Sequence, residues 1–511
     1  MIRPVPPGTP GRTAAAFAAT AAAATVLGVG HLVAAFLDPN GSPFFVLGAT
    51  VVDHTPKWLK DSAIRWFGTN DKLALAITMA VVMLVAAALI GQLARRNLAL
   101  GAGVLGVLGA AVAGLALLRP TAGPAFAVPA LVGTAAGITV LWLLFRVPAD
   151  RDTGTGPTRR TFLLASAGVV AAAAAAGAAG RYVGGRLRDI AADRAGFVLP
   201  PVADPAPPVL PEMDPPVPGL TRLVTPADEF YRIDTALQLP ALTRDDWRLR
   251  IHGMVEREIQ LDFDDLRARR AVEKMITLTC VSNEVGGDLV GNATWTGYRL
   301  TDLLAEARPS AEADMVLSRS VDGFTAGTPL DALLGNPDAL LAVAMNGAAL
   351  PVAHGYPARM VVPGLYGYVS ATKWVIDLEV TRFDRARAYW TDRGWADRAP
   401  IKTASRIDVP AAFATLPSGP ITVAGVAWAQ GRGITAVELQ VDDGPWQPAT
   451  LATAYSLDTW RPWTWTWPAT PGTHTLRVRA VDGTGTVQTD TRATPFPDGA
   501  TGRHTRVVTV R

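Results

Sequence analysis

A single cysteine, Cys280, is the residue of this sequence best suited to bind a soft metal. It is the only cysteine among 511 residues, so it has no partner for a disulfide within the chain. It follows a strand-like run, Met275 to Thr279, and a polar, glycine-rich stretch comes after it. A cysteine in such a place is either a small buried side chain or a thiolate ligand, and the cysteine alone does not decide between the two.

Composition excludes several classes of function. One cysteine is too few for a disulfide framework, an iron–sulfur cluster or a covalently attached haem. Only six histidines are present, with His31 alone inside an apolar run, so we also expect no membrane haem. A net charge of +3 does not suggest a nucleic-acid partner. The 49% hydrophobic and 18% charged residues instead indicate a protein that lies partly in a membrane.

The first 182 residues are predicted to form a membrane region that spans the bilayer five times. The apolar runs that are long enough are residues 13–37, 73–94, 98–118, 124–145 and 161–180. Arginines precede the first run and lie between the second and third and between the fourth and fifth. The positive-inside rule then places the N-terminus in the cytoplasm and everything after about residue 182 outside. We expect residues 38–72, with Trp58 and Trp66, to form an outer loop at the membrane interface.

Two motifs in this region match known signatures. Residues 101–106 match GxGxxG, but they lie in an apolar run and follow no strand, so the dinucleotide-binding interpretation fails. Residues 158–163, TRRTFL, resemble a twin-arginine export signal, because Phe-Leu stands where that signal has it; the alternative is two ordinary arginines on the cytoplasmic side. An export signal would carry the downstream domain across the membrane already folded, which suits a protein that takes up its cofactor in the cytoplasm.

Three further regions follow the apolar runs. Residues 183–222 are predicted to be a Pro-rich, extended linker, and residues 223–402 a mixed α+β domain, in which a strand from Trp247 precedes a helix from Phe263. Residues 403–511 carry short alternating runs separated by turn residues, which predicts a β-sandwich. Its tryptophan stripe (Trp463, Trp465 and Trp467) is interpreted as sandwich core and edge rather than as a ligand platform.

The middle domain carries three segments whose order and spacing are informative. They are EFYRID from Glu229, the stretch from Cys280 to Trp295-Thr-Gly, and the series MNG, HGYPAR, VPG and KW between Met345 and Trp374. Together they resemble the sulfite oxidase family of molybdopterin oxidoreductases. The resemblance covers roughly residues 220–510, because the C-terminal sandwich is similar to that family's immunoglobulin-like dimerisation domain.

The resemblance implies a molybdenum–molybdopterin cofactor with Cys280 as the protein ligand to molybdenum. A soft thiolate suits a metal that already carries dithiolene sulfurs. The resemblance further implies that Cys280 and Arg232 are catalytic. The implied cofactor-binding residues are Tyr231, Arg232, Cys280, Asp322, His354, Arg359, Ser370, Ala371, Thr372 and Lys373. Asn283, Trp295 and Phe324 match the substrate pocket, although Trp295 suits the core equally well.

Several positions depart from the sulfite-oxidising pattern. After the cysteine the family has Ala-Gly-Asn-Arg-Arg, whereas this chain has Val-Ser-Asn283-Glu284-Val285. Ile233-Asp234 replaces Asn-His, and Phe324 stands where a tyrosine is expected. Less positive charge makes a small oxyanion a poor substrate, so a neutral oxo-transfer partner such as a sulfoxide is favoured.

We therefore expect a membrane-anchored molybdenum oxidoreductase whose catalytic domain lies outside the cytoplasmic membrane. Its two electrons would be exchanged with a quinone or a redox partner protein, and the C-terminal domain could form a homodimer. The alternatives are a true sulfite oxidase or dehydrogenase and a non-catalytic binding or scaffold protein on the same fold.

Overall fold

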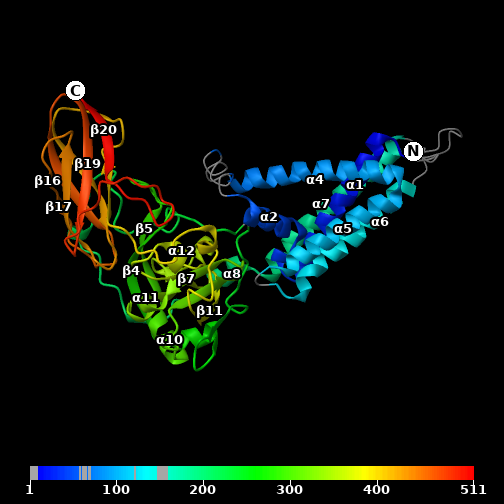
Figure 1. Ribbon diagram of the computed structural model, residues 1–511, viewed down its shortest axis with the longest axis horizontal. Coiled ribbons are helices and arrows are strands. Elements are labelled where there is room, and N and C mark those ends of the chain that lie inside the picture. Colours follow the sequence, from blue (N-terminus) through cyan, green and yellow to red (C-terminus); the bar gives the residue numbers. More distant parts are fainter. Residues whose placement is uncertain are drawn as a thin grey trace. The chain divides into compact units, whose positions relative to one another are not determined.

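A computed structural model describes residues 10–56, 59, 66, 71–119, 122–146, 159–236 and 238–511 (Figure 1). The chain divides into two compact units. The first holds residues 1–189 and the short segment 236–241, and the second holds residues 190–235 and 242–511. The expected order of a helical region, an α+β domain and a C-terminal β-sandwich is confirmed.

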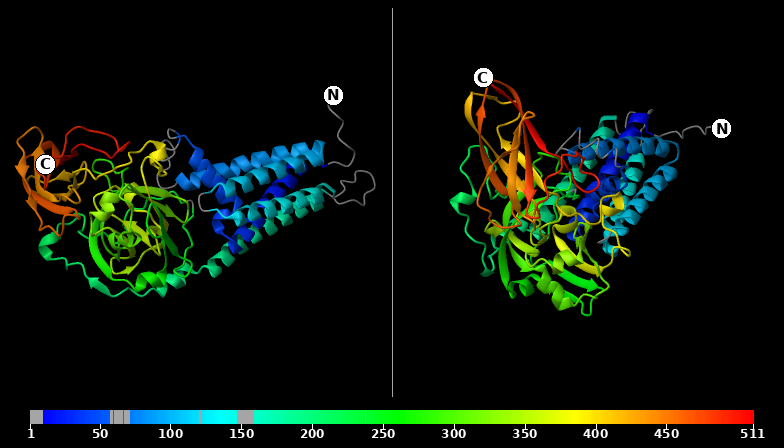
Figure 2. Two further views of the ribbon diagram at one scale, coloured as in Figure 1. Left: turned by 60° about the horizontal axis from the view of Figure 1, so that its bottom comes forward. Right: turned by 60° about the vertical axis from the view of Figure 1, so that its left-hand side comes forward.

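The first unit is helical. Its helices are α1 (Arg12–Phe36), η1 (Pro39–Gly41), α2 (Pro43–His54), α4 (Asp71–Arg96), α5 (Leu98–Leu117), η3 (Pro124–Ala127), α6 (Val128–Arg146) and α7 (Arg159–Leu187). Helix α1 packs against α4, α6 and α7, and α5 packs against α4 and α6 (Figure 2). Within the described residues, five helices are long and apolar enough to cross a membrane, in agreement with the five apolar runs of the sequence.

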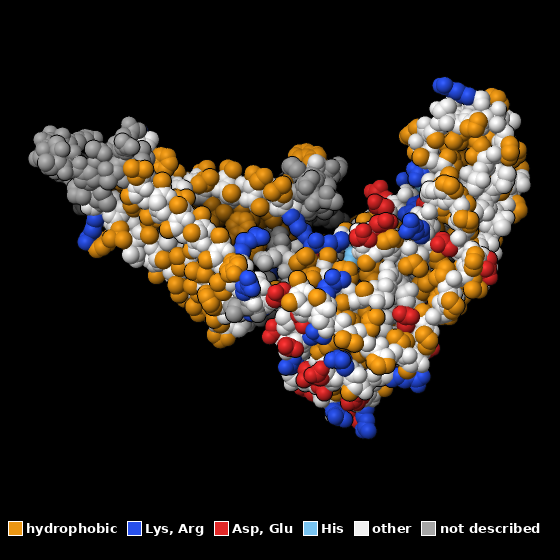
Figure 3. Space-filling model, turned by 180° about the vertical axis from the view of Figure 1, so that it is seen from behind, with side chains coloured by type: hydrophobic (Ala, Val, Ile, Leu, Met, Phe, Trp, Pro, Cys, Tyr) orange, Lys and Arg blue, Asp and Glu red, His pale blue; other side chains and the backbone are white. Residues whose placement is uncertain are grey.

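Small residues let these helices approach closely. A side chain on Gly28 would lie 2.1 Å from the backbone oxygen of Ala173 in α7, and one on Gly133 would lie 2.4 Å from the backbone oxygen of Val26. Glycine at such positions allows the backbones to touch, as in membrane helix pairs. The outer surface of this unit is largely hydrophobic (Figure 3), and Leu89 and Val107 are each more than 60% exposed.

The segment 38–72, which is predicted to lie outside at the membrane interface, contains helix α2, which the sequence analysis did not predict. Pro43 stands at the first position of this helix, where its missing N–H costs nothing. The helix is apolar but only 12 residues long, too short to span a bilayer. Trp66 is exposed, whereas Trp58 lies outside the described residues.

The α+β domain of the second unit is built on two sheets. One has the strand order β1-β4-β5-β8-β10 with β9 beside β8, and the other has the order β3-β2-β11-β6-β7. The strands are β1 (Val202–Asp204), β2 (Arg248–Gly253), β3 (Ile259–Asp262), β4 (Ala271–Thr279), β5 (Val290–Arg299), β6 (Met315–Ser320), β7 (Thr325–Pro329), β8 (Leu340–Met345), β9 (Ala348–Ala349), β10 (Arg359–Val361) and β11 (Val375–Thr381).

Short helices close the strand connections. They are α8 (Ile190–Ala195), η4 (Pro211–Met213), α9 (Phe263–Arg267), α10 (Leu300–Ala307), α11 (Leu330–Leu334), η5 (Val352–His354), α12 (Gly367–Ser370) and η6 (Thr391–Arg393). Helix α9 begins with a capping box in which Asp262 and Asp265 exchange side-chain and backbone bonds. Helix α10 buries residues 300, 303, 304 and 307, the spacing of one helix face.

The Pro-rich segment 198–219 is extended as predicted, but it packs along the second unit. Strand β1 pairs in parallel with β4, and the hydroxyl of Tyr455 donates to the backbone oxygen of Pro207. Proline fixes the backbone and leaves few internal hydrogen bonds, so neighbouring residues supply the partners.

The C-terminal sandwich pairs a sheet of order β12-β14-β18-β17 with one of order β13-β20-β19-β15-β16. The strands are β12 (Ala404–Val409), β13 (Thr415–Leu416), β14 (Gly419–Trp428), β15 (Ile434–Val441), β16 (Gln447–Pro448), β17 (Thr450–Leu451), β18 (Arg461–Ala469), β19 (Gly472–Asp482) and β20 (His504–Val510). Trp463 and Trp467 are buried in its core and Trp465 is half-buried beside it, which confirms the structural interpretation of the stripe.

The sandwich and the α+β domain share one hydrophobic core. Trp428 and Trp460 of the sandwich region are buried in the same cluster as Trp247 and Tyr366. The indole of Trp460 donates to the backbone oxygen of Leu223, 2.9 Å away. Removing such a large buried side chain costs about 3–5 kcal/mol, so the two domains depend on each other for stability.

Candidate active site

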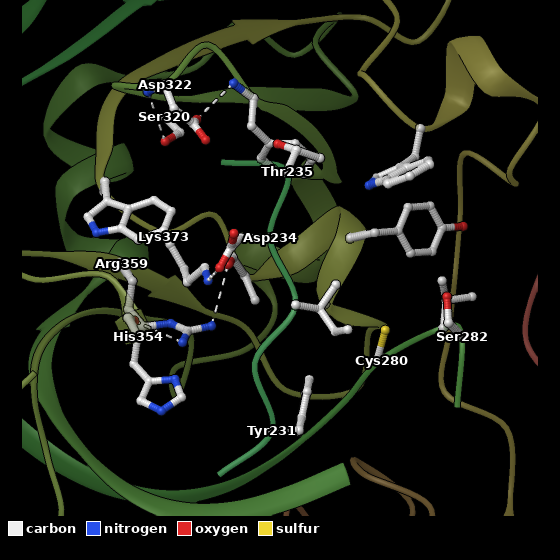
Figure 4. Close-up of a pocket in the computed structure, with 18 of the residues that line it drawn as sticks. Tyr231, Asp234, Thr235, Cys280, Ser282, Ser320, Asp322, His354, Arg359 and Lys373 are labelled. Carbon is white, nitrogen blue, oxygen red and sulfur yellow. Dashed lines mark hydrogen bonds and ion pairs between the residues drawn. The ribbon is translucent and has the colours of Figure 1, made fainter. Parts of the chain in front are cut away.

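A cavity in the second unit collects most of the predicted site residues. It holds about 950 Å³ of empty space, its open mouth included. This is the size of site that takes a small molecule or an organic cofactor. The predicted residues that line it are Tyr231, Cys280, Asp322, Phe324, His354, Arg359, Ala371 and Lys373. In Figure 4 the thiol of Cys280 and the pair His354–Arg359 lie on opposite sides, with Tyr231 and Asp234 between them.

Cys280 lies where β4 ends and begins what we call the ligand loop, residues 280–289. The Cys280 N–H donates to the backbone oxygen of Leu289 at 2.9 Å, which closes the loop. Inside it, the Leu289 N–H donates to the side-chain oxygen of Asn283 at 2.9 Å, and the Asn283 N–H donates to the Cys280 carbonyl at 3.0 Å. The thiol is thus held at a fixed point on the cavity wall, with the residue 8% exposed.

Residues of the C-terminal sandwich contact the ligand loop and hold it in place. The Arg406 guanidinium donates to the backbone oxygen of Gly287 at 2.8 Å and to the Asp408 carboxylate at 2.6 Å. A side chain on Gly286 would lie 2.2 Å from the ring of His504. The Gln430 amide donates to the backbone oxygen of Thr277 in β4 at 2.9 Å. The position of Cys280 therefore depends on residues more than 120 positions later in the sequence.

Burial sets the ionisation of the groups beside the thiol. It raises the pKa of Cys280, because a thiolate loses solvation there. It also raises the pKa of Tyr231, to which the negative charge of a Cys280 thiolate adds. Binding to a metal would reverse the effect at Cys280, because a coordinated thiol is deprotonated outright.

The opposite wall is what we call the cationic segment, residues 350–373. His354 ends η5 and bonds through Nε2 to the backbone oxygen of Ala227, 2.9 Å away. The Arg359 guanidinium donates to the backbone oxygens of His354 at 3.0 Å and Ala371 at 3.4 Å. It also lies over the Trp295 ring, with 5.0 Å from Cζ to the ring centre. A charge this deeply buried is held by carbonyl dipoles and an aromatic face.

Helix α8 fixes the start of the cationic segment. The Arg194 guanidinium donates to the backbone oxygens of Leu350 at 2.8 Å and Ala349 at 3.0 Å. The hydroxyl of Tyr356 donates to the Asp193 carboxylate at 2.7 Å, which also accepts from Arg244. The turn that carries His354 is therefore bonded on both flanks.

Lys373 is the second buried cation of this wall. Its ammonium donates to the Asp234 carboxylate at 2.9 Å and to the backbone oxygen of Ala353 at 3.0 Å. Burial lowers the pKa of Lys373 to about 8, and the Asp234 charge offsets part of that effect. Burial and then the Arg359 charge lower the pKa of His354 to about 4, so its imidazole is neutral at pH 7. Burial lowers the pKa of Arg359 to about 10, which leaves the guanidinium charged.

Asp322 and Phe324 reach the cavity from one turn after β6. The Asp322 carboxylate accepts from the Phe324 N–H at 3.1 Å, the pattern of an Asx turn. The Phe324 ring packs on Tyr389. The structure thus supports a turn role for Asp322 and leaves its contact with a pterin a prediction.

The remaining predicted residues do not line the cavity. Asn283 bonds within the ligand loop, and Trp295 is fully buried beneath Arg359. Ser370 donates to the backbone oxygens of Leu365 and Tyr366, just before its own helix. Thr372 bonds Ser318 through its hydroxyl. The Arg232 side chain is 41% exposed and donates to Asp234 at 2.7 Å. Short or buried polar side chains take the nearest backbone partner, and motif matching carries no information about side-chain direction.

Sequence reasoning missed part of the wall. The unpredicted lining residues are Phe230, Ile233, Asp234, Thr235, Val281, Ser282, Ser320, Gly367, Tyr368, Trp374, Trp390 and Trp395. The run YWTDRGW, which holds Trp390 and Trp395, is dense in aromatic residues and could have signalled a binding surface. Asp234 stood out as a departure from the family, but its ion pair with Lys373 was not predicted.

The donor set suits a molybdenum–molybdopterin cofactor. A buried thiol faces the same cavity as two buried cations, Arg359 and Lys373, which are 5% and 8% exposed. The thiol matches a soft metal, and the cations match the phosphate of the pterin. Burying two cations is expensive without an anion, and Asp234 supplies only one negative charge beside them.

Comparisons with known proteins identify a molybdopterin-binding oxidoreductase domain and an Ig domain in this chain. A family model described as an oxidoreductase molybdopterin binding domain matches residues 236–390, and a bacterial Ig domain model matches residues 405–478. An uncharacterized oxidoreductase of Bacillus subtilis is 33% identical over 149 residues, which are 29% of this chain and 72% of that protein. Human mitochondrial sulfite oxidase is 31% identical over 330 residues, which are 55% of this chain.

The chain spans 60% of the length of the human enzyme. Among solved structures, the sulfane dehydrogenase SoxCD from Paracoccus pantotrophus superposes with a TM-score of 0.49 at 24% identity. That superposition covers 56% of this chain and 83% of the other.

Proposed function

Because the chain belongs to the sulfite oxidase family of molybdopterin-dependent oxidoreductases, we propose that it is a membrane-anchored enzyme that transfers an oxygen atom to or from a small substrate. The observation that carries this proposal is the cavity itself. The one thiol of the chain lines it together with Arg359 and Lys373. A structural cysteine would need no such partners.

Each wall of the cavity has its own task in this proposal. Cys280 is the protein ligand to molybdenum, and Arg359 and Lys373 hold the phosphate of the pterin. Neutral His354 offers a hydrogen bond without adding a third positive charge, and Tyr231 and Asp322 offer further polar contacts. The chemistry that the cofactor supplies when bound is two-electron oxygen-atom transfer, and the protein positions it and sets the surrounding charge.

The first test replaces the thiol. We expect Cys280→Ser to lower turnover about 100-fold or more and to change the electron paramagnetic resonance signal of the metal, because oxygen is a harder ligand than sulfur. Glu284→Gln is a matched control, since Glu284 is exposed in the same loop and does not line the cavity. Unchanged activity and signal in Cys280→Ser would refute the ligand assignment. Purified wild-type protein without near-stoichiometric molybdenum would refute the enzyme proposal itself and favour a scaffold role.

Sulfite oxidation is the second candidate, because the human and chicken relatives bear the name sulfite oxidase. The buried carboxylate of Asp234, which lines the cavity, argues against an anionic substrate. Assays with artificial electron carriers would compare sulfite oxidation with reduction of sulfoxides and N-oxides. Faster turnover of sulfite would establish the second candidate.

The helical unit supports the membrane part of the proposal. Its apolar helices suit an anchor that keeps the N-terminus in the cytoplasm and the catalytic domain outside. The arginines at residues 159 and 160 would then serve as a twin-arginine-like signal or as cytoplasmic anchors, and Thr158 of that motif lies outside the described residues. Reporter fusions at residue 150 and after residue 200 test the topology, and a cytoplasmic signal from the second would contradict it.

We further propose that the electrons pass to or from a quinone or a redox partner protein at the membrane, and that the Ig-like domain forms a homodimer. Both can be measured on purified protein in detergent, the first by reduction with quinols and the second by its mass in solution. A monomer at micromolar concentration would contradict the dimer.

A further inference from the structure

A buried carboxylate stands in the cavity beside the cations. The Asp234 side chain is 3% exposed and lines the cavity next to Ile233 and Thr235. It accepts from the Lys373 ammonium at 2.9 Å and from the Arg232 guanidinium at 2.7 Å (Figure 4 shows the Lys373 pair). Its two cationic partners compensate for the loss of solvation that burial costs a carboxylate.

The Asp234 carboxylate pairs with the positive charge of Lys373, which an anionic substrate would need for binding. Among the described residues that line the cavity, the cationic side chains are those of Arg359 and Lys373. The anionic ones are Asp234 and Asp322, to which a metal-bound thiolate at Cys280 would add. The phosphate of the pterin brings a further negative charge. Once it is bound, the negative charges match or exceed the positive ones even when Arg232, which pairs with Asp234 from outside the lining, is counted, so an entering oxyanion meets repulsion.

Another part of the cavity wall is aromatic and uncharged. The rings of Phe324, Tyr368, Trp390 and Trp395 line the cavity, and Trp390 and Trp395 pack edge to face with 6.3 Å between their centres. Such rings bury large apolar areas and bind neutral groups with little loss of conformational entropy. The charge of the cavity and its aromatic wall thus both favour a neutral ligand with an apolar part.

We infer that Asp234 is a specificity-determining residue, which excludes small oxyanions from the cavity and leaves it to a neutral substrate whose apolar part packs on the aromatic wall. The inference rests on the proposed function, because the field it describes includes the cofactor. It assigns the selection to one side chain that is held by Lys373 and Arg232.

The test measures binding to the full-length holoenzyme in detergent by calorimetry at fixed ionic strength. The probes are sulfate and dimethyl sulfone, which have a similar tetrahedral shape and differ in charge. For the wild type we expect dimethyl sulfone to bind about tenfold tighter than sulfate, with the two probes competing. Equal or tighter binding of sulfate would overturn the inference without any variant.

Variants of Asp234 then test whether this side chain causes the weak binding of sulfate. Asp234→Asn should tighten sulfate binding about tenfold and change sulfone binding little. Asp234→Glu keeps the charge and should behave as the wild type. Asp228→Asn is the matched control, because it removes the same charge from an exposed residue that does not line the cavity. Equal sulfate affinity in Asp234→Asn and the control would overturn the inference.

Failure of the proposed function has a different signature. Molybdenum content is measured on every preparation, and a wild type without molybdenum would refute the oxidoreductase. The sulfate-to-sulfone ratio of Asp234→Asn against its control still reports on the carboxylate in that case. If Asp234→Asn does not fold, the wild-type ratio and Asp234→Glu decide the question.

Discussion

On one side of the cavity, the ligand loop with Cys280 is held by residues of the C-terminal sandwich, notably Arg406, Gln430 and His504. On the other side, the cationic segment is held by its own carbonyl groups, by helix α8 and by Asp234. The first wall thus depends on the docking of two domains, whereas the second depends on compensation of charge. Substitutions in the cationic segment should therefore reduce cofactor binding, whereas substitutions that loosen the ligand loop should reduce stability.

The largest effect is expected for Arg359 on the cationic side. Arg359→Ala removes a buried guanidinium that donates to three backbone oxygens, so we expect cofactor content to fall about tenfold or more. Molybdenum and pterin analysis of the purified protein measures it. Arg359→Lys should recover only part of the loss, because lysine lacks the planar fork. Full cofactor content in Arg359→Ala would contradict a role for this wall in cofactor binding.

The next effect concerns Arg406 on the loop side. Arg406→Ala leaves Asp408 buried without its main cation, so the free energy of unfolding should fall by about 3–5 kcal/mol. Urea denaturation in detergent, followed by near-ultraviolet circular dichroism, measures it. The double variant Arg406→Ala/Asp408→Ala should recover part of the loss. A double variant as unstable as the single one would show that the lost bond to Gly287 dominates instead.

The smallest effect is a pH dependence from His504. Burial lowers the pKa of His504 to about 4 from its ordinary 6.5, and Nδ1 accepts the Ile407 N–H. The unfolded chain therefore binds a proton at higher pH than the folded one. This contribution to stability is complete above about pH 6.5 and is lost as the pH falls towards 4.

The loss from His504 should reach up to about 3 kcal/mol. His504→Gln keeps an acceptor and should flatten the dependence of stability on pH in denaturation series between pH 7 and 4. His354 has the same sign and stays in both proteins, so the difference between them isolates His504. Identical slopes would contradict the prediction.

The sequence by itself predicted what depends on local pattern. Period-2 runs marked strands such as β2 and β18, and long apolar runs marked the helices that could span a membrane. The motif series around Cys280 and from His354 to Lys373 named residues that line the cavity, among them Cys280, His354, Arg359 and Lys373. Local periodicity missed α2, because an apolar helix of 12 residues is too short to read as a span.

Tertiary structure alone decided which side chains meet. Asp234 reaches Lys373 across 139 positions, and Arg406 reaches Gly287 across 119. In the tertiary structure the Asn283 side chain points into the ligand loop and Trp295 lies in the core. Trp390 and Trp395 line the cavity. The physical reason is that a sequence specifies which residue must be buried or paired, whereas the partner that satisfies it is chosen by packing between distant elements.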